Sequence, residues 1–82
     1  MDKQEIRKTV ESLLGDVIDR ENIELADTTV ADDIEDWDSL AHVKLILAIE
    51  DFYGIRFESD EIAAPENVGA LVDLIAAKAV GK

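Results

Sequence analysis

The sequence predicts an all-α fold, a small four-helix bundle of three main helices and one short helix with a long first loop. In three segments apolar residues recur at intervals of three and four, as on the buried face of a helix. Each of these segments follows an Asp or Asn that can cap a helix. Only "YGIRF" suggests a strand, and it is too short to pair alone. For 82 residues we expect one domain, covering residues 1–82.

The first predicted helix runs from Asp2, its N-cap, to about Ile18. Gly15 is a possible end, but the apolar face continues beyond it, so the prediction includes the following turn. This face consists of Ile6, Val10, Leu13, Leu14 and Val17.

A long acidic loop is predicted from Asp19 to Asp38, because the segment shows no sustained apolar period. Ten acidic residues lie between Asp16 and Asp38, where the only base is Arg20. Loops of this length in small domains are uncommon and often functional. Its apolar residues are expected to anchor it on the helices: Ile23, Leu25, Val30, Ile34 and Trp37.

The second predicted helix runs from Ser39 to about Tyr53, with Asp38 as N-cap and Gly54 as the C′ residue. A short helical turn is predicted within residues 58–64, capped by Ser59 and closed by Pro65.

The last helix is predicted to follow Asn67, its cap, and to run from Val68 to about Val80. Its apolar face consists of Val68, Leu71, Val72, Ile75 and Ala79.

The second helix carries more apolar residues than one face can hold. One group is expected to face the core: Leu45, Ile46, Ile49 and Phe52. A second line, displaced around the axis, consists of Leu40, Val43 and Leu47 and is bordered by Glu50 and Asp51. A chain of this size cannot bury both groups. We therefore interpret the second line, together with Glu50 and Asp51, as a partner-binding face. The alternative is that all these residues belong to the core.

Ser39 is expected in the first turn of this helix, where backbone N–H groups are unpaired and the helix dipole is positive. An anion on its hydroxyl, such as a phosphate ester, would be stabilised there. The alternative is that Ser39 shares the capping role with Asp38.

The net charge of −12 should repel nucleic acid and anionic membranes and should favour partners with basic patches. The absence of cysteine excludes disulfides, thiolate metal sites and a cysteine nucleophile. The charged N-terminal segment lacks the apolar core of a signal peptide, and no apolar run approaches a membrane span. We therefore expect a cytoplasmic monomer that does not insert into membranes.

A serine hydrolase is disfavoured, although His42 lies one helical turn from Ser39 and Asp38 is adjacent. The Gly-x-Ser-x-Gly elbow is missing, and neighbouring positions of one helix cannot readily form a catalytic triad. His42 is expected to be exposed.

A calcium-binding EF-hand loop from Asp27 to Asp38 is also rejected. The sixth position is Asp32, where the turn requires glycine, and Ala31 stands where an oxygen ligand is needed. Loose cation binding by these acids remains open, as does a helical interaction module without any prosthetic group.

The "DSL" of Asp38, Ser39 and Leu40, followed by "HVKLILAIEDFYGIRF", resembles the acyl carrier proteins and related peptidyl carrier domains. The resemblance extends over nearly the whole chain, in family order. It implies an acyl-carrier-type bundle that is not an enzyme. It also implies that a phosphopantetheinyl transferase attaches 4′-phosphopantetheine from coenzyme A to Ser39, with Asp38 as part of the motif.

The resemblance further implies that the arm's thiol carries acyl groups as thioesters to acyl-loading, condensing and acyl-transfer enzymes of fatty acid, polyketide or related biosynthesis. An aminoacyl or peptidyl cargo is the alternative. The resemblance also implies that the acyl chain is sheltered by residues between the helices: Leu45, Ile46, Ile49, Ile62, Leu71 and Ile75.

Three positions depart from the fatty-acid-synthesis type of this family, which is usually acidic where this chain has Ala41 and Lys44. Trp37 replaces part of the frequent Leu-Gly pair before the motif. These departures favour a carrier of a specialised pathway. The distance of the last helix from the chain end fits a free-standing carrier.

Overall fold

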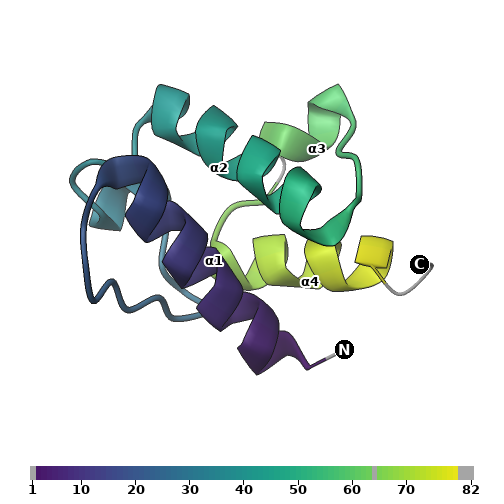
Figure 1. Cartoon of the computed structure of the whole chain (residues 1–82), viewed down its shortest axis with the longest axis horizontal. Helices are drawn as coiled ribbons and strands as arrows, with labels where there is room; N and C mark the ends of the chain where they lie inside the picture. The colour runs from purple at the N-terminus through teal and green to yellow at the C-terminus, as the bar shows by residue number, and fades with distance from the viewer. Residues whose placement is uncertain (1, 64, 80–82) are drawn as a thin grey trace.

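The computed structural model describes residues 2–63 and 65–79. Four α-helices follow one another as α1 (Lys3–Ile18), α2 (Ser39–Tyr53), α3 (Ser59–Ala63) and α4 (Val68–Ala79), with a 3₁₀ turn, Ala31–Asp33, in the first loop (Figure 1). No strand occurs in the described part of the chain. The predicted all-α bundle with one short helix is therefore confirmed. No helix in that same part is long and apolar enough to cross a membrane.

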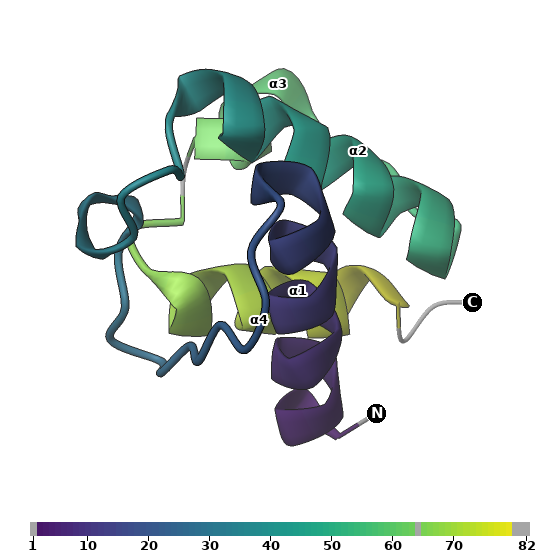
Figure 2. The ribbon, with the colours of Figure 1, turned by 60° about the vertical axis from the view of Figure 1, so that its left-hand side comes forward.

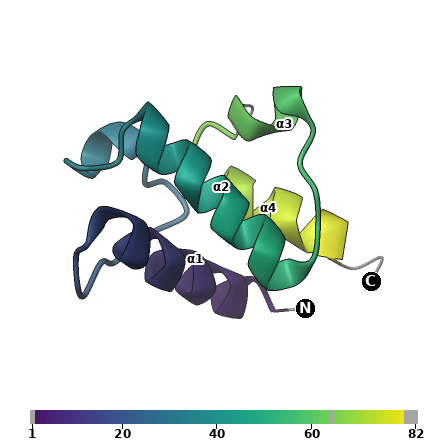
Figure 3. The ribbon, with the colours of Figure 1, turned by 45° about the horizontal axis from the view of Figure 1, so that its top comes forward.

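Helix α1 packs against both α2 and α4, and the views from the front and from above show the three main helices side by side (Figures 1 and 3). Asp2 caps α1 by accepting a hydrogen bond from the Gln4 N–H at 2.9 Å. Gly15 does not end the helix. A Cβ there would lie 2.7 Å from the Arg20 carbonyl oxygen, so glycine is needed where the chain folds back over the last turn.

The first loop is held on the helices by its backbone. The Leu25 N–H donates to the Glu11 carboxylate at 2.7 Å. The carbonyls of Asp27 and Thr29 accept from the first free N–H groups of α4, and Figure 2 shows the loop passing that end of α4. Leu25 and Trp37 are buried, whereas the other predicted anchors are half-buried. The long first loop is therefore attached to α1 and α4 by backbone hydrogen bonds and to the core by Leu25 and Trp37.

Helix α4 begins as predicted. The Asn67 side chain accepts from the Ala70 N–H at 2.9 Å, and all five residues of the predicted apolar face are buried. Gly69 allows the first loop to approach, since a Cβ there would lie 3.0 Å from both Cβ and the carbonyl oxygen of Asp27. The predicted end at Val80 lies outside the described residues.

Helix α3 begins differently from the prediction. Ser59 is its first helical residue and not its cap. The position before the helix belongs to Glu58, whose N–H donates to the Glu61 carboxylate at 2.8 Å and whose carbonyl accepts from two N–H groups of α3. The Glu61 side chain, which reaches back to the Glu58 N–H, therefore takes the capping role that the sequence predicted for Ser59. The predicted end at Ala64 lies outside the described residues.

The core is a single cluster in which all four helices and the first loop take part. Its fully buried side chains come from α1, α2 and α4: Ile6, Val10, Leu14, Leu45, Ile46, Ile49, Val68, Leu71 and Ile75. The "YGIRF" segment forms no strand: Tyr53 is the last residue of α2, Gly54 is left-handed, and Ile55 and Phe57 are buried in the same cluster.

The prediction that Phe52 faces the core is wrong, because its side chain is 62% exposed. The next residue, Tyr53, lies four positions after buried Ile49 and packs against the core instead. In the last turn of α2 the inward direction thus falls on the i+4 residue and not on the i+3 residue.

Candidate functional site

The N-terminus of α2 is capped by Asp38, which has an extended backbone. Its carboxylate accepts from the Ala41 N–H at 2.8 Å, and its carbonyl accepts from the His42 N–H at 2.9 Å. Gly54 ends the helix in the left-handed conformation, with φ of 66°. Both predicted ends of this helix are confirmed.

Ser39 is the first residue of α2 and is exposed. The side-chain capping bond comes from Asp38, and among the described residues the Ser39 hydroxyl has no hydrogen-bond partner. The interpretation that Ser39 shares the capping role is therefore wrong. Its hydroxyl lies in the first turn, at the positive end of the helix, and can take part in chemistry without loss of the cap.

A broad groove of about 540 Å³ opens beside Ser39. The first loop bounds the groove on one side, and α3 and Pro65 bound it on the other. Its lining consists of Ala31, Asp32, Trp37, Asp38, Ser39, His42, Val43, Ile62 and Pro65. One wall is mostly apolar and the other carries the carboxylates of the first loop.

The second apolar line of α2 lies on the surface, as predicted. Leu40 is 64% exposed, Leu47 58% and Val43 46%. Asp51 beside them is exposed, as is Lys44. This excludes the alternative that the whole line belongs to the core.

The two acids that border this line have different environments. One oxygen of the half-buried Glu50 accepts from the Phe57 N–H at 2.7 Å and so holds the segment after α2 against the helix. Asp51 has no such bond among the described residues. Glu50 therefore serves the fold as well as the surface, whereas Asp51 belongs to the surface alone.

Of the two departures after the motif, only one lies on this face. Ala41 is buried, so the small side chain there is a packing residue. Lys44 lies beside Leu40 and Leu47 and gives the face one positive charge among its acids.

The six predicted cargo-lining residues lie together. Ile62 is half-buried and packs on the core cluster that contains the other five: Leu45, Ile46, Ile49, Leu71 and Ile75. A small cavity of about 70 Å³ reaches Leu71 from the side of Trp37 and His42. In the described structure these residues pack on one another.

The prediction that His42 is exposed is wrong. It is half-buried; its Nδ1 lies 3.3 Å from the Trp37 indole N–H, and its Nε2 lies 2.8 Å from the Ile62 carbonyl oxygen. The Trp37 and His42 rings also stack, with centroids 5.9 Å apart and an angle of 29°. We call Trp37, His42 and the Ile62 carbonyl the clasp. The only tryptophan and the only histidine flank Ser39, which is the signal that could have revealed it.

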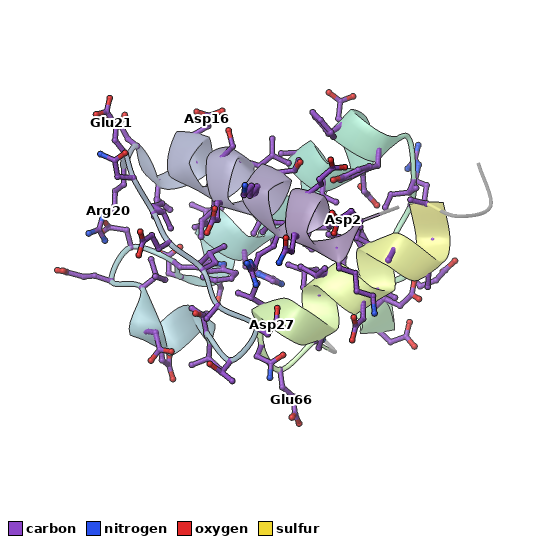
Figure 4. All side chains as sticks on the ribbon, turned by 90° about the horizontal axis from the view of Figure 1, so that it is seen from below. Asp2, Asp16, Arg20, Glu21, Asp27 and Glu66 are labelled. Atoms are coloured by element: carbon purple, nitrogen blue, oxygen red, sulfur yellow. The ribbon has the colours of Figure 1, made fainter. Side chains whose placement is uncertain are left out.

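Ion pairs lie away from Ser39. Lys78 of α4 binds Glu61 of α3 at 2.6 Å; this hydrogen bond and that from the Glu58 N–H lower the pKa of Glu61. The hydrogen bond from Lys3 to Asp73 raises the pKa of Lys3. Figure 4 shows Arg20 and Glu21 at the beginning of the first loop, next to the end of α1, and Asp27 further along it. The third ion pair of the described residues joins Arg7 of α1 to Asp27 of the first loop at 3.5 Å, so Asp32 and Asp38 beside Ser39 form no ion pair among the described residues.

Ser39 is thus an exposed serine at the acid-capped start of α2, next to the exposed apolar line of that helix. The family model described as "phosphopantetheine attachment site" matches residues 4–75. The chain belongs to this family, that of the acyl carrier proteins. It is a carrier with a covalent phosphopantetheine and not an enzyme.

The solution NMR structure of holo acyl carrier protein from Geobacter metallireducens is similar to this structure, with a TM-score of 0.84 and 36% identity. The match covers 93% of this chain and 87% of the other. The fold is thus that of the acyl carrier proteins. No curated protein matches the sequence. Carriers of this type interact with a phosphopantetheinyl transferase and with biosynthetic enzymes.

Proposed function

We propose that Ser39 is the residue that carries the phosphopantetheine arm. The observation that supports this most directly is its exposed hydroxyl, which is left free because Asp38 alone provides the side-chain cap. A phosphodiester on this oxygen would sit at the positive end of α2, where the dipole stabilises an anion. When bound, the arm supplies a thiol to a chain that has no cysteine.

The cargo is proposed to be an acyl group held as a thioester, delivered to enzymes of fatty acid, polyketide or related biosynthesis. The similarity to a holo acyl carrier protein supports acyl over aminoacyl cargo. A helical interaction module without a prosthetic group is not retained, since the family has a phosphopantetheine attachment site. Within this proposal, residues 1–82 form one carrier domain, a monomer in the cytoplasm.

The surface formed by Leu40, Val43, Leu47, Glu50 and Asp51 is proposed as the partner-binding face. Its three apolar side chains are exposed next to the proposed attachment residue. The acids and the net charge of −12 suit partners with basic patches, whose approach the field would accelerate. The proposed shelter for the cargo is the cluster of Leu45, Ile46, Ile49, Ile62, Leu71 and Ile75.

The attachment site can be tested with intact-mass measurement after incubation with coenzyme A and a broad-specificity phosphopantetheinyl transferase. The wild-type protein should gain the mass of one arm, and Ser39→Ala should gain none. Ser59→Ala is the matched control, because Ser59 is also exposed and also the first residue of a helix. An arm on Ser39→Ala, or no gain in the wild-type protein, would refute the assignment.

A further inference from the structure

The clasp joins three segments of the chain within a few residues of Ser39. Trp37 ends the first loop, His42 lies in the first turns of α2, and the Ile62 carbonyl belongs to α3. One tautomer of His42 satisfies both contacts: Nδ1 accepts from the indole N–H, and Nε2 carries the hydrogen that it donates to the carbonyl. The buried indole thereby selects the form of the imidazole that can hold α3.

Helix α3 depends on such ties. It has only five residues, and none of the side chains from Ser59 to Ile62 is fully buried. Apart from the half-buried Ile62, its described contacts with other helices are polar: the clasp to α2 and the Glu61–Lys78 ion pair to α4. Segments with so little buried apolar surface open at low free-energy cost.

The contact between α2 and α3 lies between the groove beside Ser39 and the core. His42 and Ile62 line that groove, and the hydrogen bond between the His42 side chain and the Ile62 carbonyl joins the two helices there. Behind it, Leu45, Ile46 and Ile49 are fully buried. A chain attached to Ser39 can lie in the groove without disturbing the fold, but it can enter the core only if α3 moves.

We propose that His42 acts as a latch that determines which cargo enters the core, and that a long acyl chain must break the bond between His42 and the Ile62 carbonyl to do so. This inference rests on the proposed carrier function. A short acyl group stays in the groove with the clasp intact. His42 is thus a specificity-determining residue that does not touch the thioester.

The latch itself can be tested on the unmodified protein by amide hydrogen exchange. In His42→Leu, which keeps side-chain bulk but has no N–H, the α3 amides of Glu61 and Ile62 should exchange roughly 2- to 12-fold faster, the change expected for one hydrogen bond. Amides in the middle of α2 should not change. His42→Gln should restore part of the protection, because its amide can donate to the same carbonyl.

A second variant, Trp37→Phe, removes the indole N–H but keeps an aromatic ring against His42. It should accelerate α3 exchange in the same direction but by less than His42→Leu. Unchanged α3 exchange in both variants would overturn the latch, whether or not Ser39 accepts an arm. Failure of the mass test would instead refute the carrier site and leave this readout unaffected.

The effect on cargo can be tested by loading acetyl and octanoyl groups from their coenzyme A thioesters and cleaving each product with hydroxylamine. A chain inside the core is protected from cleavage. The octanoyl-to-acetyl rate ratio should therefore fall by roughly 2- to 12-fold in His42→Leu relative to wild type, because the insertion no longer breaks the latch. The His42→Gln ratio should lie between the two. Equal ratios in wild type and His42→Leu would overturn the role of His42 in cargo entry.

Discussion

Truncation of Leu40 tests whether the exposed face of α2 binds partners. Replacement by Ala removes three carbon atoms from a side chain that is 64% exposed in the free protein. Each buried methylene contributes about 0.8 kcal/mol. If a partner covers the exposed share, Leu40→Ala should lose about 1.5 kcal/mol of binding, which is roughly a 10- to 15-fold fall in kcat/KM.

The assay is the initial rate of arm transfer from coenzyme A by a phosphopantetheinyl transferase, measured at substrate concentrations well below KM. Phe52→Ala is the matched control. Phe52 is 62% exposed on the same helix, but twelve positions later, about 120° around the axis. Both variants should unfold within about 0.5 kcal/mol of wild type, because neither side chain is in the core.

Two results would refute the reasoning. If Leu40→Ala is modified at the wild-type rate, the transferase does not contact this face. If Phe52→Ala slows as much as Leu40→Ala, the transferase responds to exposed apolar surface in general and the partner-binding face is not specific. Far-UV circular dichroism on both variants confirms that the helix itself is intact.

Four further outcomes are expected. Asp51→Lys and Glu50→Lys should both slow transfer, but in urea unfolding only Glu50→Lys should lose about 1.5–3 kcal/mol, because it leaves a backbone N–H without its charged acceptor. Added salt should raise the Tm in a thermal melt by screening repulsion among 20 acids, and a flat Tm would contradict this. Gly69→Ala should lower stability in urea by about 1–3 kcal/mol, since its Cβ would crowd Asp27. Because the pKa of Glu61 is lowered in the folded protein, its carboxylate stabilises the fold at pH values above its ordinary pKa of 4.5. This contribution should disappear as the pH falls through the lowered pKa of the folded protein, and the loss should appear as faster amide exchange in α3.

The helices were predictable because their signals are local. Asp2, Asp38 and Asn67 each accept from an N–H two or three residues ahead, and an apolar period of three or four residues identifies a buried face without knowledge of what it packs against. The surplus of apolar residues on α2 was also predictable from the local sequence. Because a chain of 82 residues cannot bury both apolar groups of this helix, one of them had to lie on the surface.

The environment of His42 was not predictable, because it depends on contacts between distant segments. No local rule brings the Ile62 carbonyl, twenty residues later, to the imidazole. The prediction that Phe52 faces the core was wrong for a related reason. Whether Phe52 or Tyr53 faces inward depends on how the neighbouring helices pack against the end of α2, and the α2 sequence alone does not decide it. The dual role of Glu50 likewise depends on the path of the chain after α2.

One helical turn carries all the distinct environments of the site. Ser39 is exposed, Leu40 is exposed on the proposed partner-binding face, Ala41 is buried and His42 bonds to α3. Successive residues differ by about 100° around the axis, so four neighbours in sequence face four directions. Substitutions at these positions should therefore have separable effects: on attachment, on partner binding, on packing and on cargo entry. If a partner binds Leu40 as proposed, it would leave the core contacts of Ala41 in place, because the two side chains point in different directions from the helix.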